Sequence, residues 1–355
     1  MERGIFTADE IDSVLKSMGM TGRTAVSRYG SGHINDTFKV DTRSGESYIL
    51  QRVNTTIFDP PSQELLKRVL LRVTSFLKSK GVTTIDFVGY ESPWRLYRFY
   101  GGCTVNEVVS SPRQAYDIGR AFAKFHDDLS DFPAPRLEEV LPKFHDTPDR
   151  LRALDEAVRR DVAGRASSVE RELEFVEKRR PEAGRIVSLM AEGAIPERVI
   201  HNDSKINNVL VMPDSSAVII DLDTVMPGSA LSDFGDMVRT STAAAAEDEA
   251  DLAKVYSKKD YFEALARGYI ERAAFLTRAE IDNLVFAGRL STLEVGVRFL
   301  TDYINGDTYF HTAYPDHNLT RARNQFKMVE SLEENADAYE KIVSELSARM
   351  SHIKQ

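Results

Sequence analysis

The stretch that decides the fold reads His201-Asn202-Asp203-Ser204-Lys205-Ile206-Asn207-Asn208, and Ile219-Ile220-Asp221-Leu222-Asp223 follows a few residues later. Between them lie an apolar run at 209–212, a polar turn at 213–216 and a second apolar run at 217–220. This order predicts a strand, a tight turn and a strand. Because a hairpin folds back on itself, we expect it to return Asp221 to the neighbourhood of Asn208.

The order of these residues is that of a kinase catalytic loop and its metal-binding aspartate. It consists of an aspartate, an asparagine five residues later and another aspartate after the next strand. In phosphoryl transfer the enzyme mainly positions an acceptor hydroxyl and neutralises charge on the phosphates. We therefore predict that Asp203 accepts the proton of the acceptor. The amide oxygen of Asn208 and the carboxylate of Asp221 are hard ligands suited to Mg²⁺. If the strand continues, Asp223 shares a face with Asp221 and is a second candidate ligand.

The triplet Asp233-Phe234-Gly235 is spelled like the magnesium-binding triplet of protein kinases. It lies too far from Asn208 for a single hairpin, so we assign the metal to Asp221 and interpret Asp233 and Asp236 as structural. Isolated aspartates and asparagines mostly cap helices and shape turns. The complete ordered set, rather than any one pair, is what indicates catalysis.

The chain predicts an α+β fold in two lobes. Short runs that alternate apolar and polar residues occur at 38–40, 48–50 and 94–99, with a helical pattern near 63–80, which indicates a small sheet-rich N-lobe over residues 1–102. Beyond it the sequence pattern becomes that of long amphipathic helices. This pattern indicates a helical C-lobe over residues 103–355 that carries the catalytic loop and an acceptor pocket. We expect these helices at 113–129, 151–178 and 280–305, and an exposed helix start at the alanines of 243–246.

The predicted first hairpin contains Gly30-Ser31-Gly32, where small residues let backbone amides approach phosphate oxygens. A Gly-x-Gly alone is equally typical of a tight turn. Together with the catalytic loop, it predicts a phosphate-covering loop. His33 and Asn35 add polar groups at its edge that could reach either the nucleotide or the acceptor.

The third strand of a kinase usually presents a lysine to the nucleotide phosphates, and here Gln51 stands at that position. Glutamine can donate a hydrogen bond but carries no charge. Arg52 could substitute, although strand alternation directs it to the opposite face. Farther on, a strand ends in glycines at 98–102, where we expect the hinge between the lobes, and Phe99 and Tyr100 are either nucleotide contacts or ordinary core.

The composition of the chain limits the classes of partner that it is expected to bind. The 355-residue chain has a net charge of −9 and a pI near 5.4, so its long-range field repels nucleic acid and anionic membranes. Its single cysteine, Cys103, excludes an intrachain disulfide, and neither a signal peptide nor a long apolar run stands out. We expect a cytoplasmic protein without a nucleic-acid or membrane partner, in which Cys103 is a small semi-buried residue.

Taken together, these motifs resemble those of a known superfamily. The chain resembles the aminoglycoside phosphotransferase and choline kinase superfamily, which shares the protein-kinase-like bilobal fold. The motif that carries this resemblance is His-x-Asp, followed after four residues by Asn and later by Ile-Asp. More narrowly, the chain resembles the N-acetylhexosamine 1-kinases of sugar salvage. The segments that carry this closer likeness run through most of the chain, at 29–35, 48–51, 144–148, 201–210, 219–229, 233–236, 298–300, 302–303 and 306–307.

The resemblance implies an ATP- and Mg²⁺-dependent kinase that phosphorylates the anomeric hydroxyl of GlcNAc or GalNAc, with Asp203 as the base. It also implies that Arg298 and Tyr309 belong to the sugar pocket; from the residues alone, a solvated charge and a partly buried aromatic fit equally well. The alternatives are a kinase of another sugar, an aminoglycoside or an amino alcohol, and a catalytically inactive nucleotide-binding regulator.

Overall fold

The computed structural model describes residues 6–30, 35–132 and 137–353, and it divides the chain into two compact units. The first unit comprises Met1–Thr104 with Leu210–Val225, and the second comprises Val105–Val209 with Met226–Gln355. The first is rich in strands and the second is mainly helical, so the predicted α+β fold with a sheet-rich N-lobe and a helical C-lobe is confirmed. The structure groups the segment that holds Asp221 with the first unit.

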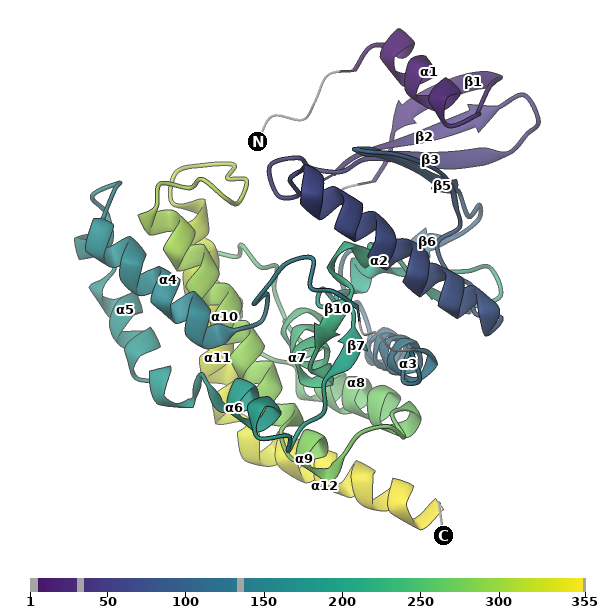
Figure 1. Ribbon diagram of the computed structural model, residues 1–355. Helices are drawn as coiled ribbons and strands as arrows, with labels where there is room; N and C mark the ends of the chain where they lie inside the picture. The colour runs from purple at the N-terminus through teal and green to yellow at the C-terminus, as the bar shows by residue number, and fades with distance from the viewer. Residues whose placement is uncertain (1–5, 31–34, 133–136, 354–355) are drawn as a thin grey trace. The chain divides into compact units, whose positions relative to one another are not determined.

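An antiparallel sheet of five strands organises the first unit, in the order β1-β2-β3-β5-β4 (Figure 1). Its hairpins follow the alternating runs of the sequence, and two helices accompany it. The elements are α1 (Ala8–Ser17), β1 (Arg23–Arg28), β2 (Asp36–Thr42), β3 (Ser47–Arg52), α2 (Pro60–Ser79), β4 (Phe87–Glu91) and β5 (Trp94–Arg98).

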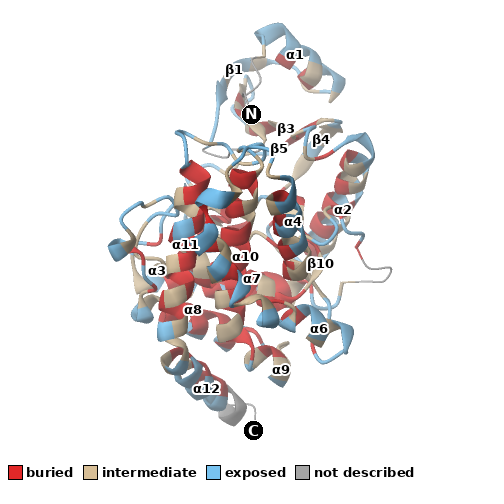
Figure 2. Ribbon diagram, turned by 90° about the vertical axis from the view of Figure 1, so that its left-hand side faces the viewer, coloured by how far each residue is buried: buried red, intermediate tan, exposed pale blue. Residues whose placement is uncertain are grey.

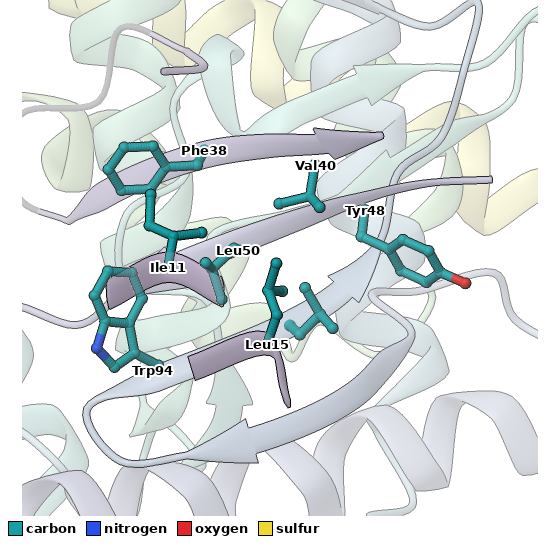
Figure 3. Packing of buried hydrophobic residues seen from close by; sticks show 8 residues of the cluster. Ile11, Leu15, Phe38, Val40, Tyr48, Leu50 and Trp94 are labelled. Carbon is teal, nitrogen blue, oxygen red and sulfur yellow. The ribbon is translucent and has the colours of Figure 1, made fainter. Parts of the chain in front are cut away.

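Strand alternation gives this sheet two chemically different faces. One face packs against α1, where Ile11 and Leu15 meet apolar side chains of β2, β3 and β5 (Figure 3). The side chains between them point to the opposite face, and the register places Gln51 of β3 directly across from Arg95 of β5. The sheet therefore has an apolar face and a polar face. Its apolar cluster consists of Ile11, Leu15, Phe38, Val40, Tyr48, Leu50, Trp94 and Leu96.

The predicted hairpin after the catalytic loop is confirmed, with strands β8 (Val209–Val211) and β9 (Ala217–Ile219). Asp214 shapes its turn by accepting hydrogen bonds from the backbone and hydroxyl of Ser216. A short strand, β6 (Thr104–Val105), pairs with β8 at the edge of this sheet. The strand does not continue through Asp223: Asp221 has a left-handed backbone, and Leu222–Thr224 form a 3₁₀ turn.

Helices dominate the second unit, and α10 runs through its middle (Figures 1 and 2). This helix is apolar on nearly every side and is buried along most of its length, as expected of a central core helix. A small sheet joins β7 (Arg198–Ile200) to β10 (Met226–Gly228). The helices are α3 (Pro112–Asp128), α4 (Thr147–Arg160), α5 (Glu170–Glu177), α6 (Arg185–Ala191), α7 (Ala230–Ser241), α8 (Lys259–Arg272), α9 (Arg278–Ile281), α10 (Leu284–Ile304), α11 (His317–Glu334) and α12 (Ala336–Ile353).

Two backbones approach closely where α3 crosses α8. A Cβ atom on Gly268 would lie 2.1 Å from the carbonyl oxygen of Tyr116, and one on Gly119 would lie 2.4 Å from that of Leu265. Only glycine allows this approach. Within the described ranges, no helix combines the length and the apolar character needed to cross a membrane.

Three expected helices differ from the structure. The single helix predicted over 151–178 is wrong, because α4 ends at a left-handed Asp161 whose carboxylate accepts the backbone N–H groups of Arg165 and Ala166. The helix predicted over 280–305 is divided near Asn283, with α9 before it and α10 after it.

The exposed helix start predicted at 243–246 is also wrong. Ala243 instead forms an isolated bridge with Ser257, and Asn324 donates hydrogen bonds to the carbonyls of Ala246 and Glu249. These tertiary contacts override the helix propensity of the alanine run.

Candidate active site

The loop that carries the catalytic motif follows β7 and is organised by one buried carboxylate, that of Asp233 on α7. Its Oδ2 accepts the backbone N–H of His201 at 2.7 Å, and its Oδ1 accepts that of Asn202 at 2.6 Å. The hydroxyl of Ser204 donates to the Asp233 carbonyl at 2.6 Å. Asn202 has φ +65°, a left-handed conformation that costs energy in a residue other than glycine.

Asp233 itself is fully buried, and its carboxylate is held by a chain of hydrogen-bonded side chains. His126 Nε2 lies 2.7 Å from its Oδ2, and the other ring nitrogen of His126 lies 2.8 Å from the hydroxyl of Tyr269. Burial alone would raise the pKa of the Asp233 carboxyl, but the hydrogen bonds from His126 and the backbone of His201 lower it below its usual range. The interpretation of Asp233 as structural agrees with these bonds, since they shape the loop.

Asp203, the predicted base, lies just beyond this anchored turn. Asn208 donates its amide N–H to the Asp203 carbonyl at 2.7 Å and to the carboxylate Oδ2 at 3.0 Å, and Lys205 Nζ lies 2.9 Å from the same Oδ2. Burial opposes the charge on Asp203, whereas Lys205, His201 and Asn208 favour it, and the net effect is a lowered pKa. The carboxylate is therefore ionised at neutral pH.

Both of these Asn208 hydrogen bonds use the amide nitrogen, which leaves the amide oxygen as the group that can bind a cation. Asp221 is exposed at the start of the 3₁₀ turn after β9. An amide oxygen and a carboxylate oxygen are the donor chemistry that a hard divalent cation takes. The residue types present thus fit a magnesium ion.

Asp223 differs from Asp221 in its surroundings. Its carboxylate is buried and receives a two-pronged ion pair from Arg95, at 2.5 Å to Oδ1 and 2.9 Å to Oδ2. Asn35 donates to the same Oδ2 at 2.9 Å. The premise that Asp223 shares a strand face with Asp221 was wrong, because the left-handed Asp221 ends the strand.

Gln51 and Arg95 form one polar network on the polar face of the N-lobe sheet. Arg95 donates from Nε at 2.9 Å and from Nη2 at 2.5 Å to Gln51 Oε1, and Gln51 Nε2 donates to Thr37 at 2.9 Å. The cation beside Gln51 is thus supplied by the neighbouring strand β5. Arg52 contributes elsewhere: its guanidinium lies 5.5 Å from the Phe6 ring centre.

The remaining predicted nucleotide and loop residues fall into two groups. Gly30 has φ +77°, which favours glycine, whereas Ser31, Gly32 and His33 lie outside the described residues. Phe99 and Tyr100 are half-buried and pack within the N-lobe: Phe99 meets the Tyr29 ring edge-on at 5.4 Å, and the Tyr100 hydroxyl donates to the Thr84 carbonyl at 2.6 Å.

Asn35 uses both ends of its amide inside the first unit. In addition to its bond to Asp223, its Oδ1 accepts the backbone N–H of Asn54 at 3.0 Å. These two hydrogen bonds fix Asn35, the residue that follows the glycine-containing loop in the sequence.

Arg298 of α10 lies near two aromatic rings, with its guanidinium carbon 5.4 Å from the centre of Phe144 and 5.6 Å from that of Phe310. Cation–π contacts of this kind favour one placement of the guanidinium and use its face, so its N–H groups can still act as donors. Tyr309 is 48% exposed on the loop after α10. Asp302 shapes that loop by accepting the backbone N–H groups of residues 308, 309 and 310.

Three residues that the structure brings to these groups were not predicted from the sequence. Lys205 is readable as a cation two positions after the candidate base. Arg95 has a weaker signal, because its partner Asp223 is 128 positions away. His145, within the segment 144–148, contacts the candidate catalytic loop through the Asn202 carbonyl at 3.0 Å, and nothing in its local pattern indicates that contact.

Comparison with known proteins gives a family and a fold. A family model described as the phosphotransferase enzyme family matches residues 25–273, well over half of the chain. A solved aminoglycoside phosphotransferase from Alicyclobacillus acidocaldarius is similar with a TM-score of 0.57 at 14% identity, covering 99% of this chain and 98% of that one.

Two further structures extend this similarity. An amicoumacin kinase in complex with AMP-PNP, Ca²⁺ and Ami has a TM-score of 0.58 at 14% identity, covering 93% of this chain and 96% of that one. A choline kinase from Streptococcus pneumoniae has a TM-score of 0.53 at 11% identity, covering 91% and 98%. At such low identity, these structures establish the shared fold.

Replacing Asp233 by Asn should destabilise the protein by about 3 kcal/mol, because a neutral amide cannot accept from two backbone N–H groups and His126 together. Since the pKa of Asp233 is lowered in the folded state, its stabilising effect is present above the ordinary pKa of an aspartate and is lost as pH falls through the lowered value. Melting curves from neutral to acid pH test this: the variant should melt several degrees lower at neutral pH and depend less on acid.

Asp214→Asn is the matched control, because that carboxylate also accepts hydrogen bonds but is exposed on the β8–β9 turn. Equal, small shifts in melting temperature for both variants would contradict the role given to Asp233.

Proposed function

Because this chain belongs to the phosphotransferase enzyme family, we propose that it is an ATP- and Mg²⁺-dependent kinase that phosphorylates the anomeric hydroxyl of an N-acetylhexosamine, GlcNAc or GalNAc. The observation that carries the reaction is the position of the Asp203 carboxylate, which lies beside Lys205 and Asn208 on an anchored loop. The acceptor rests on the resemblance to the sugar 1-kinases and on the surroundings of Arg298.

In the proposed reaction, Asp203 accepts the hydroxyl proton of the sugar as the sugar oxygen bonds to the γ-phosphorus of ATP. The bond from that phosphorus to the β,γ-bridging oxygen breaks, and ADP leaves. A carboxylate of low pKa is a weak base, which suits a loose transition state in which the attacking oxygen keeps its proton until late. Lys205, 2.9 Å from Asp203 Oδ2, adds a positive charge at the place where the transferred phosphoryl group must pass.

The proposed metal ligands are the Asn208 amide oxygen and the Asp221 carboxylate. When bound, Mg²⁺ neutralises phosphate charge and orients the γ-phosphoryl group. Asp223 is a weaker proposal, since Arg95 and Asn35 already bind both of its oxygens. The amicoumacin kinase complex with AMP-PNP and Ca²⁺ supports a nucleoside triphosphate and a divalent cation for this fold.

For the nucleotide, we propose the loop at 30–32 together with Gln51, Phe99 and Tyr100. Arg95, hydrogen-bonded to Gln51, supplies a positive charge in this network that glutamine lacks. This proposal accounts for a kinase-like N-lobe without the usual lysine on its third strand.

For the acceptor, we propose Arg298 and Tyr309 with His33 and Asn35. The guanidinium of Arg298, which lies near two aromatic rings, can donate hydrogen bonds to sugar hydroxyl oxygens. These oxygens must be hydrogen-bonded when they leave water. The same positive charge disfavours a cationic acceptor such as choline or an aminoglycoside, which requires acidic or aromatic surfaces.

An acceptor panel tests the proposal. ADP release from ATP with Mg²⁺ should be strong with GlcNAc and GalNAc and weak with galactose, choline and kanamycin, and phosphorus NMR should place the phosphate on the anomeric carbon. Turnover with a cationic acceptor and none with either acetamido sugar would contradict the proposed acceptor. Failure of every acceptor, with tight Mg·ATP binding, would favour the inactive regulator.

The two aspartates after β9 should behave differently. Asp221→Asn should raise the Mg²⁺ concentration for half-maximal rate about tenfold or more, with little change in melting temperature, because the residue is exposed and would bind the metal directly. Asp223→Asn should instead destabilise the protein by about 3 kcal/mol or more, because Arg95 is then left buried without its partner.

Magnesium titrations of ADP release and melting curves separate the two roles. If Asp223→Asn raised the Mg²⁺ requirement and left the melting temperature unchanged, Asp223 would be a ligand rather than an anchor.

A further inference from the structure

The segment at 144–148 contains a histidine that reaches the catalytic loop from outside it. His145 Nε2 lies 3.0 Å from the carbonyl oxygen of Asn202, and its Nδ1 lies 2.8 Å from Oε1 of Glu294 on α10. A carbonyl and a carboxylate are both acceptors, so both ring nitrogens must carry hydrogen for the two bonds to exist. With Glu294 ionised, the geometry therefore requires the imidazolium form.

The charges around His145 are consistent with that form. Glu294 is buried and also accepts the hydroxyl of Thr147 at 2.6 Å. Asp236 of α7 adds a second negative charge, although it is paired with Arg239. Arg298 of α10 and Arg150 of α4 are the cations that share the field of Glu294.

Burial alone would lower the pKa of His145, but Glu294 outweighs it and the pKa is raised. The pKa of Glu294 is lowered by His145 in turn, against its own burial. The pair thus joins a part-buried histidine to a buried glutamate, and its charged form is favoured at neutral pH.

The contact of His145 falls on the peptide group that leads into Asp203. The carbonyl of this group belongs to Asn202 and is held by His145, and its N–H belongs to Asp203 and lies 3.2 Å from Nδ1 of His201. Asp233 holds the preceding peptide N–H, that of Asn202, at 2.6 Å. Two consecutive peptide groups around the left-handed Asn202 are therefore fixed, and the direction of the Asp203 side chain follows from them.

We propose that His145, as an imidazolium paired with Glu294, is a positioning residue for phosphoryl transfer that sets the orientation of Asp203 through the Asn202 carbonyl. This inference rests on the proposed role of Asp203 as the base. His145 contacts neither the nucleotide nor the acceptor in this account; it acts through the backbone.

The raised pKa of His145 determines how kcat should depend on pH. A histidine whose pKa is raised in the folded state keeps its charge and both hydrogen bonds below that pKa and loses one of them as pH rises through it. The kcat of the wild-type enzyme should therefore fall on the alkaline side as His145 loses its proton.

Two variants test the role. His145→Phe keeps a ring in the site and removes both bonds, so kcat should fall about 10- to 100-fold with the KM for ATP nearly unchanged, since a misplaced catalytic group loses rate rather than nucleotide affinity. Glu294→Gln keeps an acceptor but removes the charge that holds the imidazolium, so the alkaline fall in kcat should move to lower pH by about one unit or more.

Thr147→Val is the control, because it removes a different hydrogen bond to the same Glu294 and leaves the Asn202 contact in place. Its pH profile should retain the wild-type alkaline limb. If His145→Phe changed only the melting temperature, with kcat and the limb as in the wild type, His145 would be a core residue and the proposal would be overturned.

A readout independent of turnover separates this inference from the proposed function. Nitrogen-15 NMR of the His145 ring should show both nitrogens protonated at neutral pH in the wild type and a neutral ring at a lower pH in Glu294→Gln. A neutral ring in the wild type at neutral pH overturns the inference whatever the acceptor is. Absence of turnover with every acceptor, by contrast, would count against the proposed function alone.

Discussion

The carboxylate of Asp233 is the constraint on which the candidate catalytic loop, residues 201–208, depends. It is fully buried, it accepts two consecutive backbone N–H groups at the end of β7, and it is itself held by His126 and Tyr269. A buried charge is costly unless hydrogen bonds compensate it, so this arrangement is stable only when the loop adopts one conformation. The left-handed Asn202 follows from it, and Asp203 is delivered at a fixed place beside Asn208 and Lys205.

The first unit also contains a buried charge that is compensated, and it lies on one face of the five-stranded sheet. One face is an apolar cluster covered by α1, and the opposite face carries Gln51 and Arg95, which are paired across β3 and β5. Arg95 is buried, and it is neutralised by Asp223 from the segment after β9. This ion pair ties the hairpin segment to the sheet, and it explains why Asp221 and Asp223, two residues apart, have such different surroundings.

Much of this arrangement was predictable from local sequence signals. The β8–β9 hairpin has apolar runs around a polar turn, and the helix at 112–128 has clear periodicity, so both were predicted correctly. The helix predicted over 151–178 failed because the backbone turns at Asp161, and the one predicted at 243–246 failed because Ala243 and Ala246 take part in tertiary contacts. The partners of Arg95 and His145 were missed for a different reason: they lie far away in the sequence, and a single chain contains no signal for such pairing.

The central claim is that Asp203 is the base of a phosphoryl transfer, and Asp203→Asn tests it most directly. The measurement compares steady-state turnover with the best acceptor and Mg·ATP binding by calorimetry for the wild type and this variant. The account predicts that turnover falls by at least about 100-fold, because the group that accepts the proton is gone, while the affinity for Mg·ATP stays within about threefold. Unchanged turnover with intact nucleotide binding would contradict the account, since Asp203 would then have no part in the chemistry.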